Sequence, residues 1–116
     1  MKYKNLVITQ NAKLFQSIRP ILICADLDVS QATTYQKALE LLSCFHYVLV
    51  VADLSFPDID GIKLIHSLRR LAQVPILAFT SKYTTEEEIQ VLFAGADDYL
   101  DCGVVLDPER CLAHIT

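Results

Sequence analysis

Residues 47–53 read YVLVVAD, an apolar run without alternation that stops at a carboxylate. A strand in a parallel sheet has this pattern when helices cover both faces, because neither face then meets water. The run therefore predicts a central strand over Tyr47–Ala52, with Asp53 at its carboxyl end. A second run of the same kind, PILAFT at residues 75–80, predicts another buried strand that ends at Thr80.

Shorter apolar runs and helical spacings fill the remaining chain. Three further strands are predicted at residues 5–9, 28–32 and 97–100. Between the strands, apolar side chains recur at the spacing of a helix. Helices are therefore predicted around residues 14–22, 35–42, 62–68 and 89–93. Pro20 is expected to kink the first helix or to begin a second turn of helix, because proline removes a backbone donor and clashes with the preceding turn.

The helix after residue 80 has clear signals at both ends. Thr84 or Thr85 is expected to be its N-cap, and the acidic run Glu86–Glu88 then lies in the first turn, at the positive end of the helix dipole. Gly95 is expected to close the helix. Its inner face is predicted to consist of Ile89, Leu92 and Phe93.

Strands that alternate with helices predict a five-stranded parallel sheet with helices on both faces, a doubly wound α/β fold. A length of 116 residues fits one domain over residues 1–116. Asp107 and Pro108 signal the start of a last helix, which is expected to be cut short at Thr116. Ligands of such sheets bind beyond the carboxyl ends of the strands. The candidate site residues are therefore Gln10, Asn11, Asp53, Thr80 and residues 101–103.

The composition argues against several classes of protein. Ten basic residues face 14 acidic ones, for a net charge of −4, and no basic cluster offers the positive patch that nucleic acid requires. No apolar run approaches the roughly 20 residues that span a bilayer, so we expect a cytoplasmic protein without membrane contact. The four cysteines lack the CxxC spacing of zinc sites and are expected to be small buried apolar residues.

Three motifs carry a resemblance to a known family: DLSFPDIDG at 53–61, VPILAFTS at 74–81 and AGADDYL at 94–100. In order and spacing they resemble the receiver domains of bacterial two-component response regulators. The resemblance covers essentially the whole chain and implies a flavodoxin-like receiver fold. It implies that Asp53 accepts a phosphoryl group from a sensor histidine kinase, that Thr80 bonds a phosphoryl oxygen, and that Tyr99 changes rotamer in the phosphorylated state. The residues alone also allow Asp53 as a cap or structural charge, Thr80 as an ordinary strand end and Tyr99 as a core tyrosine.

The resemblance further implies a magnesium ion, held by Asp53, the carbonyl of Ser55 and an acidic pair after the first strand. Here the pair is replaced by Gln10 and Asn11, or by Thr9 and Gln10 if the register is one residue off. Because Mg²⁺ prefers charged oxygen ligands, a site with these residues is predicted to be weak or absent. The segment ILICADLD at 21–28 also looks like the family's opening motif, but it lies too close to Asp53 for a helix, a strand and a second helix to fit between them.

A lysine that the resemblance implies is missing as well. Cys102, followed by Gly103, stands where the family carries Lys and Pro. A neutral thiol cannot bridge a phosphoryl oxygen as an ammonium group does. Lys82, close after Thr80, either supplies a substitute ammonium group or is a solvated loop lysine.

Three functions are candidates for a chain with these motifs. The first is a phospho-accepting receiver that controls an output domain. The motif at 94–100 is most like receivers that precede a winged-helix DNA-binding domain and that form homodimers through their fourth helix, fifth strand and fifth helix. DNA would then be bound only by a missing effector domain. The second is a degenerate receiver that acts as an interaction or dimerisation module without phosphorylation. The third, a small α/β enzyme, is not expected, because there is no glycine-rich phosphate loop, nucleophile elbow or histidine-centred triad.

Overall fold

The computed structural model describes residues 3–24 and 27–101. These residues contain a sheet of five parallel strands in the order β2-β1-β3-β4-β5. The strands are β1 (Tyr3–Ile8), β2 (Leu27–Ala32), β3 (Leu49–Asp53), β4 (Ile76–Thr80) and β5 (Asp98–Asp101). The predicted fold class, a doubly wound five-stranded parallel sheet, is thus confirmed.

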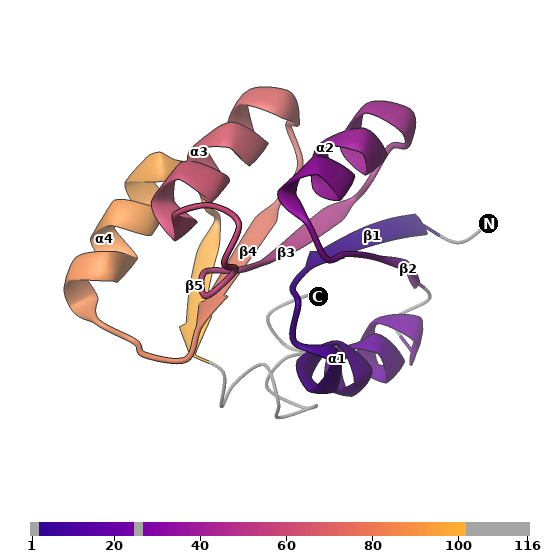
Figure 1. The fold of residues 1–116 in the computed structure, drawn as a ribbon, viewed down its shortest axis with the longest axis horizontal. Helices are drawn as coiled ribbons and strands as arrows, with labels where there is room; N and C mark the ends of the chain where they lie inside the picture. The colour runs from indigo at the N-terminus through magenta and orange to yellow at the C-terminus, as the bar shows by residue number, and fades with distance from the viewer. Residues whose placement is uncertain (1–2, 25–26, 102–116) are drawn as a thin grey trace.

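Four helices alternate with the strands: α1 (Ala12–Cys24), α2 (Tyr35–Cys44), α3 (Gly61–Leu71) and α4 (Thr85–Ala94). Helices α2, α3 and α4 cover one face of the sheet and α1 lies on the other (Figure 1). The predicted last helix from Asp107 lies outside the described residues. In the described ranges, no helix has the length and apolarity needed to cross a membrane.

The core forms two layers, one on each side of the sheet. Val50 and Ala52 of β3 belong to the layer under α2, α3 and α4, whereas Val51 belongs to the layer that contains Leu14 and Ile18 of α1. Side chains of a strand alternate between its faces, so β3 must be apolar at every position to fill both layers. This explains the apolar residues 49–52 of β3. The strand begins two residues later than predicted, at Leu49, and ends one residue later, at Asp53.

Side-chain caps fix three of the helix starts. The hydroxyl of Thr34 accepts a hydrogen bond from the Lys37 N–H at 3.0 Å at the start of α2. The carboxylate of Asp60 caps α3 in the same way. Of the two alternatives for α4, Thr84 is the cap, because its hydroxyl accepts from the Glu87 N–H at 3.1 Å.

Helix α1 continues through Pro20. The proline leaves the carbonyl of Gln16 without its backbone donor. Both residues are exposed, so water can bond that carbonyl and the helix tolerates the loss.

The predicted inner face of α4 was also wrong. Ile89, Leu92 and Phe93 are 51%, 43% and 88% exposed, whereas Val91 is fully buried. The stripe that faces the sheet runs through Glu87, Val91 and Ala94, at helical spacing. The acidic Glu87 occupies one position of the stripe that faces the sheet. The apolar pattern therefore indicated the side of α4 that faces solvent.

Candidate functional site

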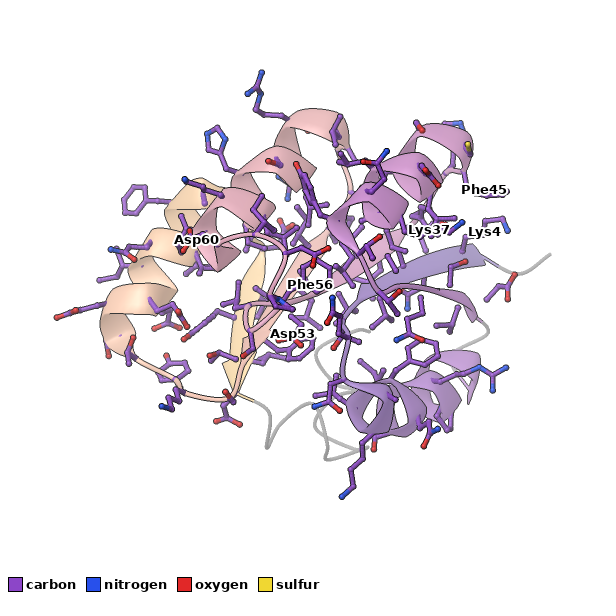
Figure 2. All side chains as sticks on the ribbon, in the orientation of Figure 1. Lys4, Lys37, Phe45, Asp53, Phe56 and Asp60 are labelled. Carbon is purple, nitrogen blue, oxygen red and sulfur yellow. The ribbon has the colours of Figure 1, made fainter. Side chains whose placement is uncertain are left out.

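The carboxyl ends of the strands bring polar residues to one edge of the sheet. Thr9 directly follows β1, Asp53 ends β3, and Thr80 ends β4. All three side chains are buried, with Asp53 at 8% exposure. Figure 2 shows Asp53 where the chain leaves the sheet, close to Phe56, whose N–H donates to the Asp53 carbonyl at 3.1 Å.

Both carboxylate oxygens of Asp53 accept hydrogen bonds from the protein. The Thr9 hydroxyl donates to Oδ2 at 2.8 Å, and the Ser55 N–H donates to Oδ1 at 2.8 Å. The Thr9 oxygen in turn accepts from the Asn11 N–H at 3.0 Å, which orients the hydroxyl. Neutral donors therefore hold the carboxylate in a fixed orientation on the side of β1.

The structure does not bring the amide groups of Gln10 and Asn11 to Asp53. The Asn11 Oδ1 accepts from the Leu14 N–H at 3.0 Å, so it caps α1. The Gln10 amide donates to Asp58 at 3.3 Å, and the same carboxylate accepts from the Tyr35 N–H at 2.9 Å. The geometry thus supports the alternative register, in which Thr9 takes the position next to Asp53.

These residues do not fit a magnesium ion. Thr9 presents a proton to the Asp53 carboxylate where a cation would need an oxygen lone pair, and Asp53 alone supplies a charged ligand. Within the described ranges, no three His, Cys, Asp or Glu side chains are grouped closely enough to hold a metal ion.

Thr80 and Tyr99 lie on the other side of Asp53. In the sheet register Asp53 pairs with Phe79, so Thr80 lies one residue further along the adjacent strand. The Thr80 hydroxyl accepts from the Lys82 N–H at 3.1 Å. The Lys82 residue itself is exposed. Cys102, at the position of the missing lysine, lies outside the described residues.

Tyr99 is buried between β5 and α4, with 3% exposure. Its hydroxyl donates to Oε1 of Glu87 at 2.6 Å and accepts from the Thr84 N–H at 3.4 Å. Burial and the hydrogen bond to the Glu87 carboxylate raise the pKa of Tyr99 to about 12. The tyrosine is therefore neutral at physiological pH and connects the last described strand to the first turn of α4.

Sequence reasoning missed two residues of this site. Thr9 was considered only as an alternative to the acidic pair, and Glu87 only as a favourable charge at a helix start. The sequence signal for Thr9 is a polar residue directly after the apolar strand residues Leu6–Ile8. No comparable signal identifies Glu87, because its partner Tyr99 is twelve residues away on another element.

The sequence matches the family described as response regulator receiver domain over residues 6–113. This chain belongs to that family. The receiver domain is 32% identical over 95 residues to the KDP operon transcriptional regulatory protein KdpE of Escherichia coli (strain K12), covering 82% of this chain and 42% of that protein. It is 34% identical over 99 residues to the probable transcriptional regulator ycf27 of Porphyridium aerugineum, covering 85% of this chain and 41% of that protein. The receiver domain thus spans less than half the length of these relatives.

Solved structures share the fold of this receiver domain. A two-component response regulator from Clostridium difficile superposes with a TM-score of 0.91 at 23% identity, over 98% of this chain and 93% of that one. A CheY-like response regulator receiver domain protein from Methanospirillum hungatei JF-1 gives a TM-score of 0.89 at 23% identity, over 99% of this chain and 91% of that one. The flavodoxin-like receiver fold implied by the motifs is therefore confirmed.

Proposed function

We propose that this receiver domain is the input part of a transcriptional regulator and that Asp53 is its phosphoryl acceptor. In the cytoplasm, where we place this domain, a sensor histidine kinase would supply the phosphoryl group, and an effector domain outside residues 1–116 would contact DNA. The names of the relatives and the fraction of their length that this chain covers support the first part. We infer that the domain acts in signalling and does not turn over a substrate.

The position of Asp53 is the observation that carries the second part. The carboxylate ends a buried strand, and the Ser55 and Thr9 donors hold it on the side of β1. Each carboxylate oxygen keeps a lone pair that can attack the phosphorus of the phosphoryl donor. The new O–P bond forms as the bond from phosphorus to the donor's leaving group breaks. On the adjacent strand, Thr80 is placed to bond an oxygen of the transferred group once its hydroxyl turns from Lys82.

The same geometry predicts a slow reaction. Phosphoryl transfer requires stabilisation of the negative charge on the oxygens of the transferred group. Proteins that bind a phosphoryl group during transfer usually provide a metal cation together with an ammonium group. Here the residues do not fit magnesium, and Cys102 replaces the lysine. The Thr80 hydroxyl is the one remaining stabilising group that we assign among the described residues.

The experiment is incubation with acetyl phosphate in magnesium, followed by intact-mass measurement. We expect a minor fraction of the chain to gain one phosphoryl group, and we expect Asp53→Asn to gain none. Thr80→Ala should reduce the fraction further, while Ser81→Ala, at the exposed neighbouring hydroxyl, should leave it unchanged. A wild-type chain that gains no mass, or an equal gain in Asp53→Asn, would overturn the assignment of Asp53 as acceptor.

We also propose a second function, association without phosphorylation, which rests on the surface of α4. Ile89, Leu92 and Phe93 form an apolar stripe that is open to solvent. Single exposed apolar residues are common, but three on one helix face mark an interaction site. We propose that this stripe, together with β5, is the homodimer surface of the domain.

Sedimentation analysis tests that surface. Phe93→Glu should convert a dimer into a monomer, whereas Leu71→Glu should not, although Leu71 of α3 is also 57% exposed. Asp53→Asn should dimerise as the wild type does if association needs no phosphoryl group. Equal loss of dimer in the Phe93 and Leu71 variants would contradict a specific α4 surface.

A further inference from the structure

Two tyrosines contact the first turn of α4. The Tyr99 hydroxyl donates to Glu87 at 2.6 Å. The Tyr83 ring lies against the Tyr99 ring, with centroids 4.9 Å apart and planes at 38°. A hydrogen bond to Glu88 raises the pKa of Tyr83. The two tilted rings, one from β5 and one from the β4–α4 loop, thus lie together beside the first turn of α4.

Glu87 occupies an unusual place for an acidic residue. It is half-buried on the stripe of α4 that faces the sheet, where Val91 and Ala94 follow it. A carboxylate there loses part of its hydration, and it needs a donor to compensate. The buried Tyr99 hydroxyl needs an acceptor for the same reason, and the 3.4 Å contact from the Thr84 N–H does not supply one. Each group thus satisfies the other.

The pair joins the edge strand of the sheet to the helix with the exposed apolar stripe. Tyr99 pairs in register with Ala78 of β4, two residues before Thr80. Glu87 lies one turn before Val91, the buried residue of α4. Any movement of the Tyr99 ring away from α4 must break a charge-assisted hydrogen bond, which is stronger than a bond between neutral groups.

We propose that Glu87 is a positioning residue that holds Tyr99 buried against α4 while Asp53 carries no phosphoryl group. This inference rests on the proposed phosphorylation of Asp53 and on the change of Tyr99 rotamer that the family resemblance implies for the phosphorylated state. It means that the unmodified domain already holds the ring in its buried position. The orientation of α4, and with it the stripe at Ile89, Leu92 and Phe93, is then set by the Tyr99–Glu87 pair.

The position of Tyr99 can be measured by NMR on the full 116-residue chain carrying 3-fluorotyrosine. Tyr99→Phe identifies the Tyr99 line among the five tyrosines. A soluble spin label then reports the exposure of each ring. In the wild type and in Asp53→Asn we expect the same protected Tyr99 line. In Glu87→Ala we expect that line to shift towards the exposed tyrosines and to lose its protection.

Matched variants separate positioning from general effects. Glu86→Ala removes the same charge from the same helix turn, but Glu86 is exposed, so Tyr99 should stay protected. Glu87→Gln keeps an acceptor oxygen and should retain the protected line, which also answers the case in which Glu87→Ala does not fold. The proposal is overturned if Glu87→Ala leaves Tyr99 protected, if Glu86→Ala exposes it equally, or if Glu87→Gln behaves as a folded Glu87→Ala does.

This readout is independent of phosphoryl transfer. A chain that takes up no phosphoryl group at Asp53 fails the proposed function, yet its Tyr99 line still tests the role of Glu87. Conversely, normal phosphoryl uptake with an exposed Tyr99 in Asp53→Asn would overturn the inference and leave the acceptor assignment intact.

Discussion

The Thr9 hydroxyl and the Asp53 carboxylate form a 2.8 Å hydrogen bond between residues that are 44 positions apart in the chain. The bond crosses from the end of β1 to the end of β3, two strands that pair directly. The neutral Thr9 hydroxyl thus offsets part of the hydration that the Asp53 carboxylate loses on burial. One oxygen of the carboxylate is thus satisfied by a protein hydroxyl, and the consequences of this bond can be measured.

Replacing Thr9 by Val removes the donor and keeps the shape of the side chain. Because the Asp53 oxygen then lacks one partner in a buried site, we expect the free energy of unfolding to fall by about 1–3 kcal/mol. Thr9→Ser, which keeps the hydroxyl, should lose much less. Urea titration measures both variants, and equal losses in the two would show that the methyl group, not the hydrogen bond, matters.

Introducing carboxylates should create a cation site, but only in the register that the structure supports. Thr9→Asp with Gln10→Asp is expected to bind Mg²⁺ saturably in calorimetric titration, because a charged oxygen then replaces the hydroxyl beside Asp53. Gln10→Asp with Asn11→Asp should bind more weakly, since position 11 caps α1. Adding Asp53→Asn to the first variant should abolish binding. Equal affinity of the two double variants would contradict the register.

The corrected orientation of α4 predicts unequal effects of two neighbouring truncations. Val91→Ala removes a fully buried side chain and should lower the free energy of unfolding by about 2 kcal/mol. Phe93→Ala, at 88% exposure, should change it by less than about 0.5 kcal/mol. Denaturant titration of both variants, under conditions where the chain is monomeric, decides this. A larger loss of unfolding free energy in Phe93→Ala than in Val91→Ala would indicate that Phe93 lies on the inner face, as the apolar pattern predicts.

Gly95 ends α4 with a φ of 125°, a backbone conformation that residues with a side chain rarely adopt. A Cβ at this position would lie 2.9 Å from Cβ and Cγ of Arg69, whose guanidinium donates to the Gly95 carbonyl at 2.7 and 3.0 Å. We expect Gly95→Ala to lower the free energy of unfolding by about 1–3 kcal/mol through backbone strain and crowding. In an Arg69→Ala background the same substitution should be less harmful. An unchanged loss in both backgrounds would leave strain as the sole cause.

Alkaline pH should destabilise the domain through Tyr99. Its folded pKa of about 12 exceeds the ordinary value of 10.0, because burial first, and then the Glu87 carboxylate, disfavour the phenolate. The stabilisation is therefore complete below about pH 10, and it is lost as the pH rises towards 12. Subtracting the urea stability of Tyr99→Phe at each pH isolates this residue from Tyr83, whose pKa is raised in the same direction. A difference that is flat between pH 10 and 12 would contradict the burial of the hydroxyl.

The sequence predicted those parts of the structure that depend on local patterns. The runs at 47–52 and 75–80 identified β3 and β4, because a strand covered on both faces must be apolar throughout. The cap of α4 was likewise narrowed to Thr84 or Thr85, since the capping bond spans three residues. Asp53 could be placed at the edge of the sheet because it ends such a strand.

The contacts of the site could not be predicted in the same way. The bonds from Thr9 to Asp53 and from Tyr99 to Glu87 join different elements, and no periodicity indicates which side chains will meet. The ten-residue helix α4 carries two possible inner stripes. The more apolar stripe faces solvent, and the stripe with Glu87 brings its carboxylate to the Tyr99 hydroxyl.

The place of β1 in the sheet has a consequence for synthesis of the chain. β1 is made before the other strands, yet it lies between β2 and β3. Until residues 49–53 have left the ribosome, the side of β1 that pairs with β3, at Leu6, Val7 and Ile8, has no partner strand. Unpaired apolar edges of this kind recruit other chains. Nascent chains stalled before residues 49–53 have left the ribosome should therefore depend on chaperones, whereas chains that have released all five strands should not.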